Sequence, residues 1–394
     1  MARVGIIGTG WGARVQVPAF REAGLEVVAI SGHNAERTRR VAGDLGIEPF
    51  DDWRALIDAN IDLVTIVTPP SEHLTMARAG LDAGKHVLCE KPTALNVVEA
   101  EQLVAAAHKH PDRFALIDHE LRFLPSLRAA RERMGELGGI RYAEVRYASP
   151  SRGDRSRAWN WWSDAGQGGG IWGAVGSHFV DTLRFLGMEI EAVQATLQTI
   201  VGERPFENGK RNVTSDDFSA VHLRLAGPAQ PAALVAQGSA DSRAPNILPR
   251  GLLAGGAIVS MTLSTVASGP DEPATLTIHG EEGAMRLVGE ELLTAMRGEP
   301  FSVAISAGRS DRKGNSAGGA FGTGTFHLGR ALRSALDDGD RDALATAATF
   351  EDGLAQQRVL DAARASNARG GAWVGVEQSS WNADAPVDVE ATKR

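Results

Sequence analysis

The chain contains a single cysteine and lacks both an excess of positive charge and long apolar runs. Cys89 on its own excludes disulfide bonds within the chain and is typical of a reducing compartment. The formal net charge of −8 argues against a nucleic-acid surface, since phosphate binding needs clustered Lys and Arg. No apolar stretch approaches membrane-spanning length, so we expect no membrane partner. Because no signal peptide precedes the first expected strand, we expect a cytoplasmic protein.

The length and composition indicate a globular protein with more than one domain. The chain has 394 residues, of which 43% are hydrophobic and 23% charged, and it has no internal repeat. Because this length exceeds what one compact core usually supports, we expect two domains. We predict a dinucleotide-binding domain at residues 1–122, a substrate-binding and oligomerisation domain at 123–380, and a tail at 381–394.

The first third of the chain alternates expected strands and helices. The expected strands are 4–7, 26–30, 63–67, 86–89 and 114–117, and the expected helices are 14–23, 35–45, 72–83 and 97–108. Such alternation predicts an α/β fold with a doubly wound, parallel Rossmann sheet. The ligand crevice is then expected beyond the carboxyl ends of the strands.

After about residue 125 the pattern changes to long polar-apolar alternations, which predict an open, mainly antiparallel sheet. The expected strands are 140–148, 193–201, 218–225, 257–265, 275–278 and 284–288, and the expected helices are 176–186, 326–336 and 343–366. We therefore predict an α+β second domain. An open sheet with one apolar face needs a cover, so we expect a homo-oligomer, either a dimer or a tetramer.

A glycine-rich turn follows the first expected strand. Gly8 allows a tight turn, and Gly10 lets the backbone approach a pyrophosphate that the next helix faces with its amides. Ala13 is the small residue wanted at the third position of the fingerprint. The alternative is an ordinary strand-to-helix turn, but a clean strand before it and a second strand about twenty residues on favour a dinucleotide site. The expected cofactor contacts here are Gly8, Thr9, Gly10, Trp11 and Gly12.

The residues after the second expected strand predict which dinucleotide binds. A site selective for NAD usually has Asp or Glu there to bind the ribose hydroxyls. This chain has Ser31, followed by Asn34 and Arg37, and a hydroxyl with a nearby arginine holds a 2′-phosphate. The alternative is a polar helix start with a capping residue and a solvated arginine. We predict NADP, or else NAD, bound by Ser31, Asn34 and Arg37.

Glu90, Lys91 and Pro92 directly follow the buried strand 86–89. A lysine at this end of a parallel strand points into the crevice where the nicotinamide is expected, and Pro92 fixes the turn. The alternative is a surface lysine in a loop. We predict that Lys91 is catalytic and that Glu90 and Lys91 contact the cofactor, while Cys89 is a small core residue.

A glycine-rich segment at 168–176 leads into a helix that carries His178 and Asp181 on one side. A lone helical histidine is more often structural. Here the close backbone approach and the nearby carboxylate favour catalysis, with Asp181 orienting the ring and His178 accepting a proton near neutral pH. No metal is expected at this site.

These segments, in this order, resemble the glucose-fructose oxidoreductase / inositol dehydrogenase / rhizopine-catabolism family, Gfo/Idh/MocA. Glu90-Lys91-Pro92 and the run 68–73 after the third expected strand carry the resemblance, which covers nearly the whole chain. It implies a Rossmann domain, a second domain with an open sheet that is often used for oligomerisation, and hydride transfer between NAD(P) and a carbon of a sugar, polyol or related carbohydrate. It also implies cofactor contacts from Thr68, Pro69, Pro70 and His73.

One position departs from the family pattern Asp-x-Gly-x-His-x-x-Asp, because Ala174 stands where the first Asp is expected. Catalysis is then left to two residues. The resemblance implies that His178 removes the hydroxyl proton while Lys91 stabilises the developing alkoxide. The stretch from Ser31 to Arg37 also resembles the NADP-holding stretch of glucose-fructose oxidoreductase.

Several further residues are expected at the substrate. Trp159, Trp161 and Trp162 offer faces that stack on a sugar, with Trp159 and Trp162 favoured, although two of the three rings are equally well explained as core. Arg122 and Asp181 are also expected to bind substrate. The alternative for Arg122 is an ion pair across the domain junction.

Three functions remain open at this point. The first is an NADP-dependent sugar or polyol oxidoreductase. The second is an enzyme that retains NADP for internal redox or for oxidation-assisted elimination. The third is a dinucleotide-binding sensor without catalysis, which the loss of a carboxylate at Ala174 favours and the presence of Lys91 and His178 opposes.

Overall fold

The first sheet carries the glycine-rich turn at the carboxyl end of one of its inner strands. The computed structural model describes residues 1–227, 253–306 and 318–378, and this sheet has the strand order β17-β6-β5-β4-β1-β2-β3. All neighbours are parallel except β17, which pairs with β6 antiparallel. Without β17, this is a dinucleotide-binding order with its switch point between β1 and β4. The strands are β1 Arg3–Ile7, β2 Glu26–Ser31, β3 Glu48–Phe50, β4 Leu63–Ile66, β5 His86–Cys89, β6 Ala115–Ile117 and β17 Ala348–Thr349.

Helices cover both faces of this sheet, which confirms the predicted doubly wound Rossmann fold. One face is covered by α1 Val17–Glu22, α2 Ala35–Leu45 and α8 Gly319–Asp337, and the other by α3 Trp53–Asp58, α4 His73–Asp82 and α5 Val97–Lys109. The helix expected at 14–23 begins later, because residues 12–16 form a π-helical turn ahead of it. Pro18, near the start of α1, has no N–H to donate and its ring crowds the preceding turn.

The second sheet has nine strands in the order β16-β15-β14-β13-β7-β12-β11-β8-β18. Among the described strands only β7 and β12 pair in parallel, so the prediction of a mainly antiparallel sheet is confirmed. A separate hairpin consists of β9 Glu203–Phe206 and β10 Gly209–Asn212. The strands of the sheet are β7 Ile140–Ala148, β8 Ile190–Gln198, β11 Phe218–Leu225, β12 Leu253–Ser264, β13 Thr275–Gly280, β14 Gly283–Val288, β15 Glu291–Met296, β16 Ser302–Ile305 and β18 Val374–Gly375.

Helices of the same chain cover the apolar face of the second sheet. They are α6 Pro125–Arg133, α7 Ser177–Phe185 and α9 Phe350–Ala368, and they share one core with the strands. The outward face carries exposed polar side chains such as Glu144, His222 and Thr262. The physical reason given for an oligomer, an apolar face in need of a partner, is therefore wrong for the described part of this sheet, and oligomerisation itself stays a prediction.

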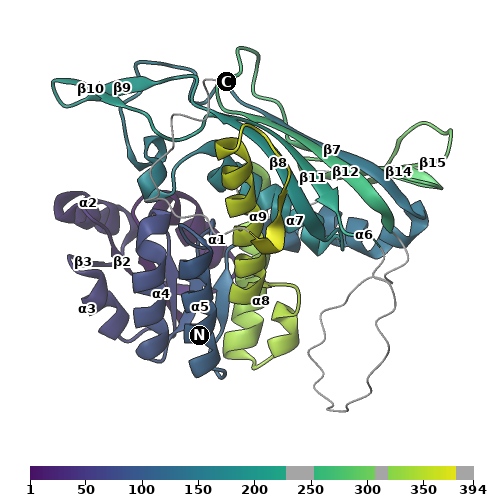
Figure 1. Cartoon of the computed structure of the whole chain (residues 1–394). Helices are drawn as coiled ribbons and strands as arrows, with labels where there is room; N and C mark the ends of the chain where they lie inside the picture. The colour runs from purple at the N-terminus through teal and green to yellow at the C-terminus, as the bar shows by residue number, and fades with distance from the viewer. Residues whose placement is uncertain (228–252, 307–317, 379–394) are drawn as a thin grey trace.

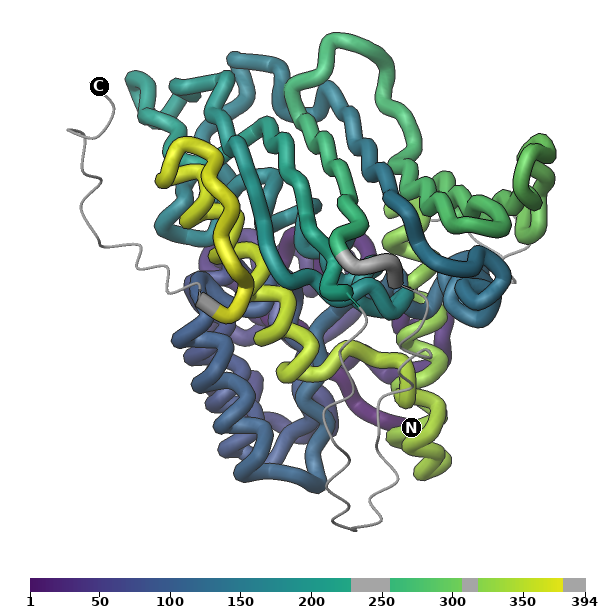
Figure 2. Tube along the Cα trace, turned by 45° about the vertical axis from the view of Figure 1, so that its right-hand side comes forward, coloured from purple at the N-terminus to yellow at the C-terminus, as the bar shows by residue number. Residues whose placement is uncertain are grey.

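The C-terminal part of the described chain links the two sheets. Helix α8 packs on α1 and β17 extends the first sheet, whereas α9 packs against both α5 and β8. Figures 1 and 2 show the N-terminal strands and helices, in purple and blue, below the teal and green strands of the second sheet, and Figure 1 shows α8 beside them in yellow-green. The proposed boundary at residue 122 stays a prediction, and the structure adds that α8 and β17 return to the first sheet. The tail expected at 381–394 lies outside the described residues.

None of the helices within 1–227, 253–306 and 318–378 is both long enough and apolar enough to cross a membrane.

Candidate active site

The glycine-rich turn after β1 has the geometry of a cradle for a pyrophosphate. Gly8 has a φ of +138°, and a Cβ there would lie 2.2 Å from the carbonyl oxygen of Val67, so only glycine fits. A Cβ on Gly12 would lie 2.7 Å from Cγ2 of Ile6, so glycine lets the following turn pack closely on β1. A Cβ on Gly10 would meet nothing within 4 Å. The backbone at Gly10 is thus open to a ligand, as a bound dinucleotide requires.

A cleft of about 920 Å³ runs from this turn to the second sheet, a volume typical of a cofactor site. Its walls come from both parts of the fold. The predicted residues that line it are Gly8, Thr9, Gly10, Trp11, Ser31, Arg37, Thr68, Pro69, Glu90, Lys91, Trp162 and His178.

Other predicted residues do not line the cleft: Gly12, Asn34, Pro70, His73, Arg122 and Asp181. Asn34 caps α2 by accepting the backbone N–H of Arg37 at 2.8 Å. His73 is fully buried and contacts the carbonyl oxygens of Thr68 at 3.0 Å and Pro92 at 3.1 Å, so it ties the two loops together. Burial lowers the pKa of His73 to about 4, which keeps the ring neutral.

The end of the cleft near Ser31 contains both a cation and carboxylates. The Arg37 guanidinium donates from Nη2 to the carbonyl oxygen of Thr9 at 3.2 Å and lines the wall. Asp51 and Asp52, which follow β3, line the same region, and Asp51 forms an ion pair with Arg39. We missed these two carboxylates because the short strand β3 was not predicted.

At the other end, Lys91 links the first sheet to the helix that carries His178. The Lys91 ammonium donates from Nζ to the carbonyl oxygen of Ala174 at 2.8 Å. Ala174 belongs to the π-helical turn Trp172–Gly176, which runs directly into α7. Lys91 and His178, predicted from segments far apart in the sequence, thus line the same cleft.

A cluster of buried acidic groups lies beside Lys91. Gln16 donates from Nε2 to Asp118 at 2.8 Å and to Glu90 at 3.4 Å. Desolvation, and then the charge of Asp118, raise the pKa of Glu90 to about 8, and desolvation raises that of Asp118 to about 6. Glu120 also lines the cleft, and burial raises its pKa well above the usual range. Asp118 and Glu120 were not predicted from the sequence, because their closeness to Glu90 depends on the pairing of β5 with β6.

His178 has only 4% of its surface exposed and lies between two aromatic rings. Its ring centroid is 4.8 Å from that of Phe321 and 5.8 Å from that of His119. Burial, and then the nearby charges of Lys91 and His119, hold the pKa of His178 well below its usual value. The ring is therefore neutral at neutral pH and can accept a proton.

The prediction that Asp181 orients the His178 ring is wrong. Nδ1 of His178 has no hydrogen-bond partner among the described residues, and the Asp181 carboxylate is bound by Arg122. The Arg122 guanidinium donates to it at 2.6, 2.9 and 3.2 Å. A guanidinium donates several hydrogen bonds to a buried carboxylate, whereas an imidazole N–H donates one. Asp181 therefore binds Arg122 and not His178, its neighbour three positions before it on the helix.

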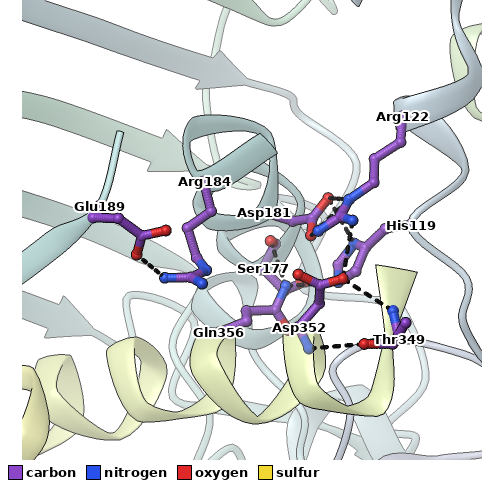
Figure 3. Close-up of polar contacts among 9 residues, drawn as sticks. All are labelled: His119, Arg122, Ser177, Asp181, Arg184, Glu189, Thr349, Asp352 and Gln356. Carbon is purple, nitrogen blue, oxygen red and sulfur yellow. Dashed lines mark hydrogen bonds and ion pairs between the residues drawn. The ribbon is translucent and has the colours of Figure 1, made fainter. Parts of the chain in front are cut away.

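This ion pair belongs to a buried polar network directly behind His178, shown in Figure 3. Arg122 also donates to Asp352 of α9 at 3.1 Å, so it pairs with both α7 and α9. Gln356 is 2.7 Å from Nε2 of His119 and donates at 2.7 Å to the carbonyl oxygen of Ser177. Burial lowers the pKa of His119 to about 4. The alternative interpretation of Arg122, an ion pair across the junction, is the one that the geometry supports.

The tryptophans divide between the cleft and the outer surface. Trp161 and Trp162 line the cleft, and the Arg152 guanidinium lies 3.9 Å from the ring centroid of Trp162. Trp159 lies instead against the β9–β10 hairpin, where its Nε1–H donates to the carbonyl oxygen of Asn212 at 3.0 Å. The Arg211 guanidinium covers the ring of Trp159 at 3.8 Å. Trp159 is therefore not part of the cleft wall.

Further residues of the wall lie after residue 140 and were not predicted as site residues from the sequence. They include Tyr147 on β7, Gln167, Val175 and Phe321 on α8. Val175 lies in the glycine-rich segment 168–176. The other three lie in no motif, so only the fold brings them to the site.

Two family models match the sequence. Residues 2–117 match an oxidoreductase family with an NAD-binding Rossmann fold, and residues 128–246 match the GFO/IDH/MocA C-terminal domain. Glucose-fructose oxidoreductase domain-containing protein 2 of Xenopus laevis is 32% identical over 399 residues, which cover 97% of this chain and 95% of that protein. The human protein of the same name is 30% identical over 388 residues, or 95% of this chain and 93% of that protein.

Solved structures share the two-part architecture. A levoglucosan dehydrogenase in complex with NADH superimposes with a TM-score of 0.77 at 23% identity, covering 95% of this chain and 99% of that one. An oxidoreductase domain protein from Kribbella flavida gives a TM-score of 0.77 at 26% identity, covering 95% of this chain and 100% of that one. The likeness to the first of these supports the fold alone.

Proposed function

The chain belongs to the GFO/IDH/MocA family of NAD-binding oxidoreductases, and on that premise we propose that it transfers a hydride between NADP or NAD and a carbon of a sugar, polyol or related carbohydrate. The observation that carries this proposal is the hydrogen bond from Nζ of Lys91 to the carbonyl oxygen of Ala174. It joins the loop after β5 to the turn before α7, so that an ammonium and the His178 imidazole line one cleft with the glycine-rich turn.

The two residues have complementary roles in the proposed reaction. When bound, the nicotinamide supplies the hydride acceptor or donor. As an alcohol carbon loses its hydride, its hydroxyl must lose a proton, and the neutral imidazole of His178 accepts it. The Lys91 ammonium stabilises the negative charge that develops on that oxygen. In the reducing direction the same pair returns the proton.

A preference for NADP over NAD is proposed from the other end of the cleft. Ser31 stands where a ribose-binding carboxylate is usual, and Arg37 lines the wall beside it. The negative charge of Asp51 would repel a 2′-phosphate, but the ion pair of Asp51 with Arg39 offsets part of that charge. Substrate contacts are proposed for Trp162, which lines the cleft wall.

The test is turnover of a panel of sugars and polyols with NADP⁺ by Lys91→Met and His178→Asn variants. Lys91→Met should lower the rate by about two to three orders of magnitude, and His178→Asn by about two to four. Because the pKa of His178 is held well below 6.5, the acidic limb of the oxidation profile should lie below that pH and flatten in His178→Asn.

The control is binding of NADPH by fluorescence titration, which should stay within severalfold of the parent in both variants. If both variants keep parental turnover, the catalytic assignment is wrong. If NADPH binds but no carbohydrate is turned over by the parent, the sensor hypothesis gains. Turnover without added cofactor would favour the enzyme that retains NADP.

A further inference from the structure

A second cavity, of about 470 Å³, adjoins the cofactor cleft at His178. Tyr147, Val175, His178 and Phe321 line both cavities, so these four residues form the boundary between them. We call the second cavity the side chamber. Its size lies within the range of roughly 300–1,000 Å³ that is usual for small-molecule sites.

The wall of the side chamber is mainly apolar. The apolar side chains come from 121–127 before and within α6, from α7 and from the strands β13 and β14; they are Leu121, Leu124, Leu127, Phe179, Leu276 and Leu287. Two small hydroxyl residues, Ser126 and Thr182, interrupt them, and Tyr147 adds a phenol at the boundary with the cleft. The Ser126 hydroxyl is buried without a hydrogen-bond partner among the described residues, so it is available to a ligand.

Charged side chains lie only at the solvent edge of the described wall, because the buried His178 ring is neutral. Asp271 and Glu272 are exposed there, and Glu272 is 3.4 Å from the Arg146 guanidinium. The interior therefore offers little compensation for the hydroxyls of a second sugar ring, and burying these without partners costs free energy. Apolar atoms would gain free energy by leaving water for the same space.

We propose that the side chamber holds an apolar substituent, such as an alkyl or aryl aglycone, of the molecule whose hydroxyl reacts at His178. This inference rests on the proposed function, because it takes the reacting carbon to lie between the nicotinamide end of the cleft and His178. A substrate that fills both spaces has a carbohydrate at the boundary and an apolar group beyond it. The protein then discriminates in favour of glycosides or carbohydrate derivatives with an apolar group and against free sugars.

The experiment measures the binding of two homologous series to the NADP⁺-loaded protein by calorimetric titration. The first series is methyl, butyl, hexyl and octyl glucoside below their micelle-forming concentrations, and the second is the matched 1-alkanols. Affinity should rise about three- to fourfold for each methylene that enters the chamber, until the chamber is full. An affinity that does not depend on chain length in either series overturns the proposal.

Two variants locate the effect. Ala274→Trp fills the chamber from its half-buried wall and should remove the gain with chain length in both series. Leu287→Gln keeps similar size but adds a polar amide to the wall, and it should reduce the gain. Ala220→Trp, on the outward face of β11, is the matched control and should leave the gain unchanged. A gain that persists in Ala274→Trp and Leu287→Gln while both variants bind NADPH overturns the assignment.

The outcome separates this inference from the proposed function. If affinity rises with chain length and Ala274→Trp removes the rise, the side chamber binds the apolar group. This result holds even where no glucoside is oxidised, and in that case the proposed reaction is the part that fails. If simple sugars are oxidised with the expected loss in Lys91→Met but chain length has no effect, the reaction stands and the chamber assignment fails.

Discussion

Replacing Arg122 with Met should destabilise the fold far more than replacing an equally well-bonded arginine on the surface. The side chains of Arg122 and Asp181 are only 7% and 4% exposed, and three hydrogen bonds join them. The substitution would leave the Asp181 carboxylate buried without a cation. Removing one partner of such a pair costs about 3–5 kcal/mol, because an uncompensated charge remains in the interior. The loss at Asp352 adds less, since that side chain is 32% exposed and water replaces the contact.

Arg133 provides the matched control. Its guanidinium donates to Glu136 at 2.8, 3.0 and 3.0 Å, so the hydrogen-bond geometry resembles that of the buried pair. The side chains are 35% and 51% exposed, however, and an exposed pair contributes only about 0.2–1 kcal/mol. Arg133→Met should therefore change the free energy of unfolding by no more than about 1 kcal/mol.

The measurement is equilibrium unfolding in urea, followed by tryptophan fluorescence and far-UV circular dichroism, for the parent and both variants. If fluorescence and circular dichroism give different transitions, the variants are compared by the transition in which the second sheet unfolds. Equal losses in Arg122→Met and Arg133→Met, or a loss below about 1 kcal/mol in Arg122→Met, would refute the reasoning. The double variant Arg122→Met/Asp181→Leu should be more stable than Arg122→Met, because no carboxylate then stays unpaired at position 181.

Three further predictions concern titration, cofactor choice and thiol reactivity. Desolvation, and then the charge of Asp118, raise the pKa of Glu90 to about 8, so this group contributes stability that is present below its unfolded pKa near 4.5 and is lost as the pH rises through about 8. In Glu90→Gln the free energy of unfolding should therefore fall less steeply between these two pH values. Equal slopes in the parent and the variant would contradict this prediction. Arg37→Ala should weaken NADPH binding by roughly 1–3 kcal/mol with little change for NADH in fluorescence titrations, and equal losses would sink the proposed preference. Cys89 is fully buried and desolvation raises the pKa of its thiol, so an aromatic disulfide reagent should react only after denaturant is added; fast labelling of the folded protein would show that β5 opens readily.

The parts of the fold that could be predicted from the sequence are those with strong local signals. The run from Val4 to Ile7 and the glycines after it specify a buried strand and its turn, and the structure has β1 and the turn there. Strand β3 was missed because Glu48–Phe50 is only three residues long and has a proline at its centre. Strand β17 has two residues and depends on β6 for its pairing.

The candidate site divides in the same way. Lys91 and His178 each lie beside a local signal, a strand end or a glycine-rich helix entry, and both line the cleft. The network of Arg122 could not be predicted, because its carboxylate partners lie 59 and 230 positions away. The spacing along α7 predicted a contact between His178 and Asp181, but the Arg122 guanidinium binds the Asp181 carboxylate instead.

Helix α9 has a mechanical consequence for the cleft. Over a short stretch near its end it holds both halves of the molecule: Asp361 accepts the N–H of Val97 at 2.9 Å on the side of the first sheet, and Ser366 accepts that of Ala195 at 2.9 Å on β8. A helix is stiff along its axis, so a hinge rotation between the halves would have to break one of these attachments. The two attachments of α9 thus oppose a rotation that would change the width of the cleft.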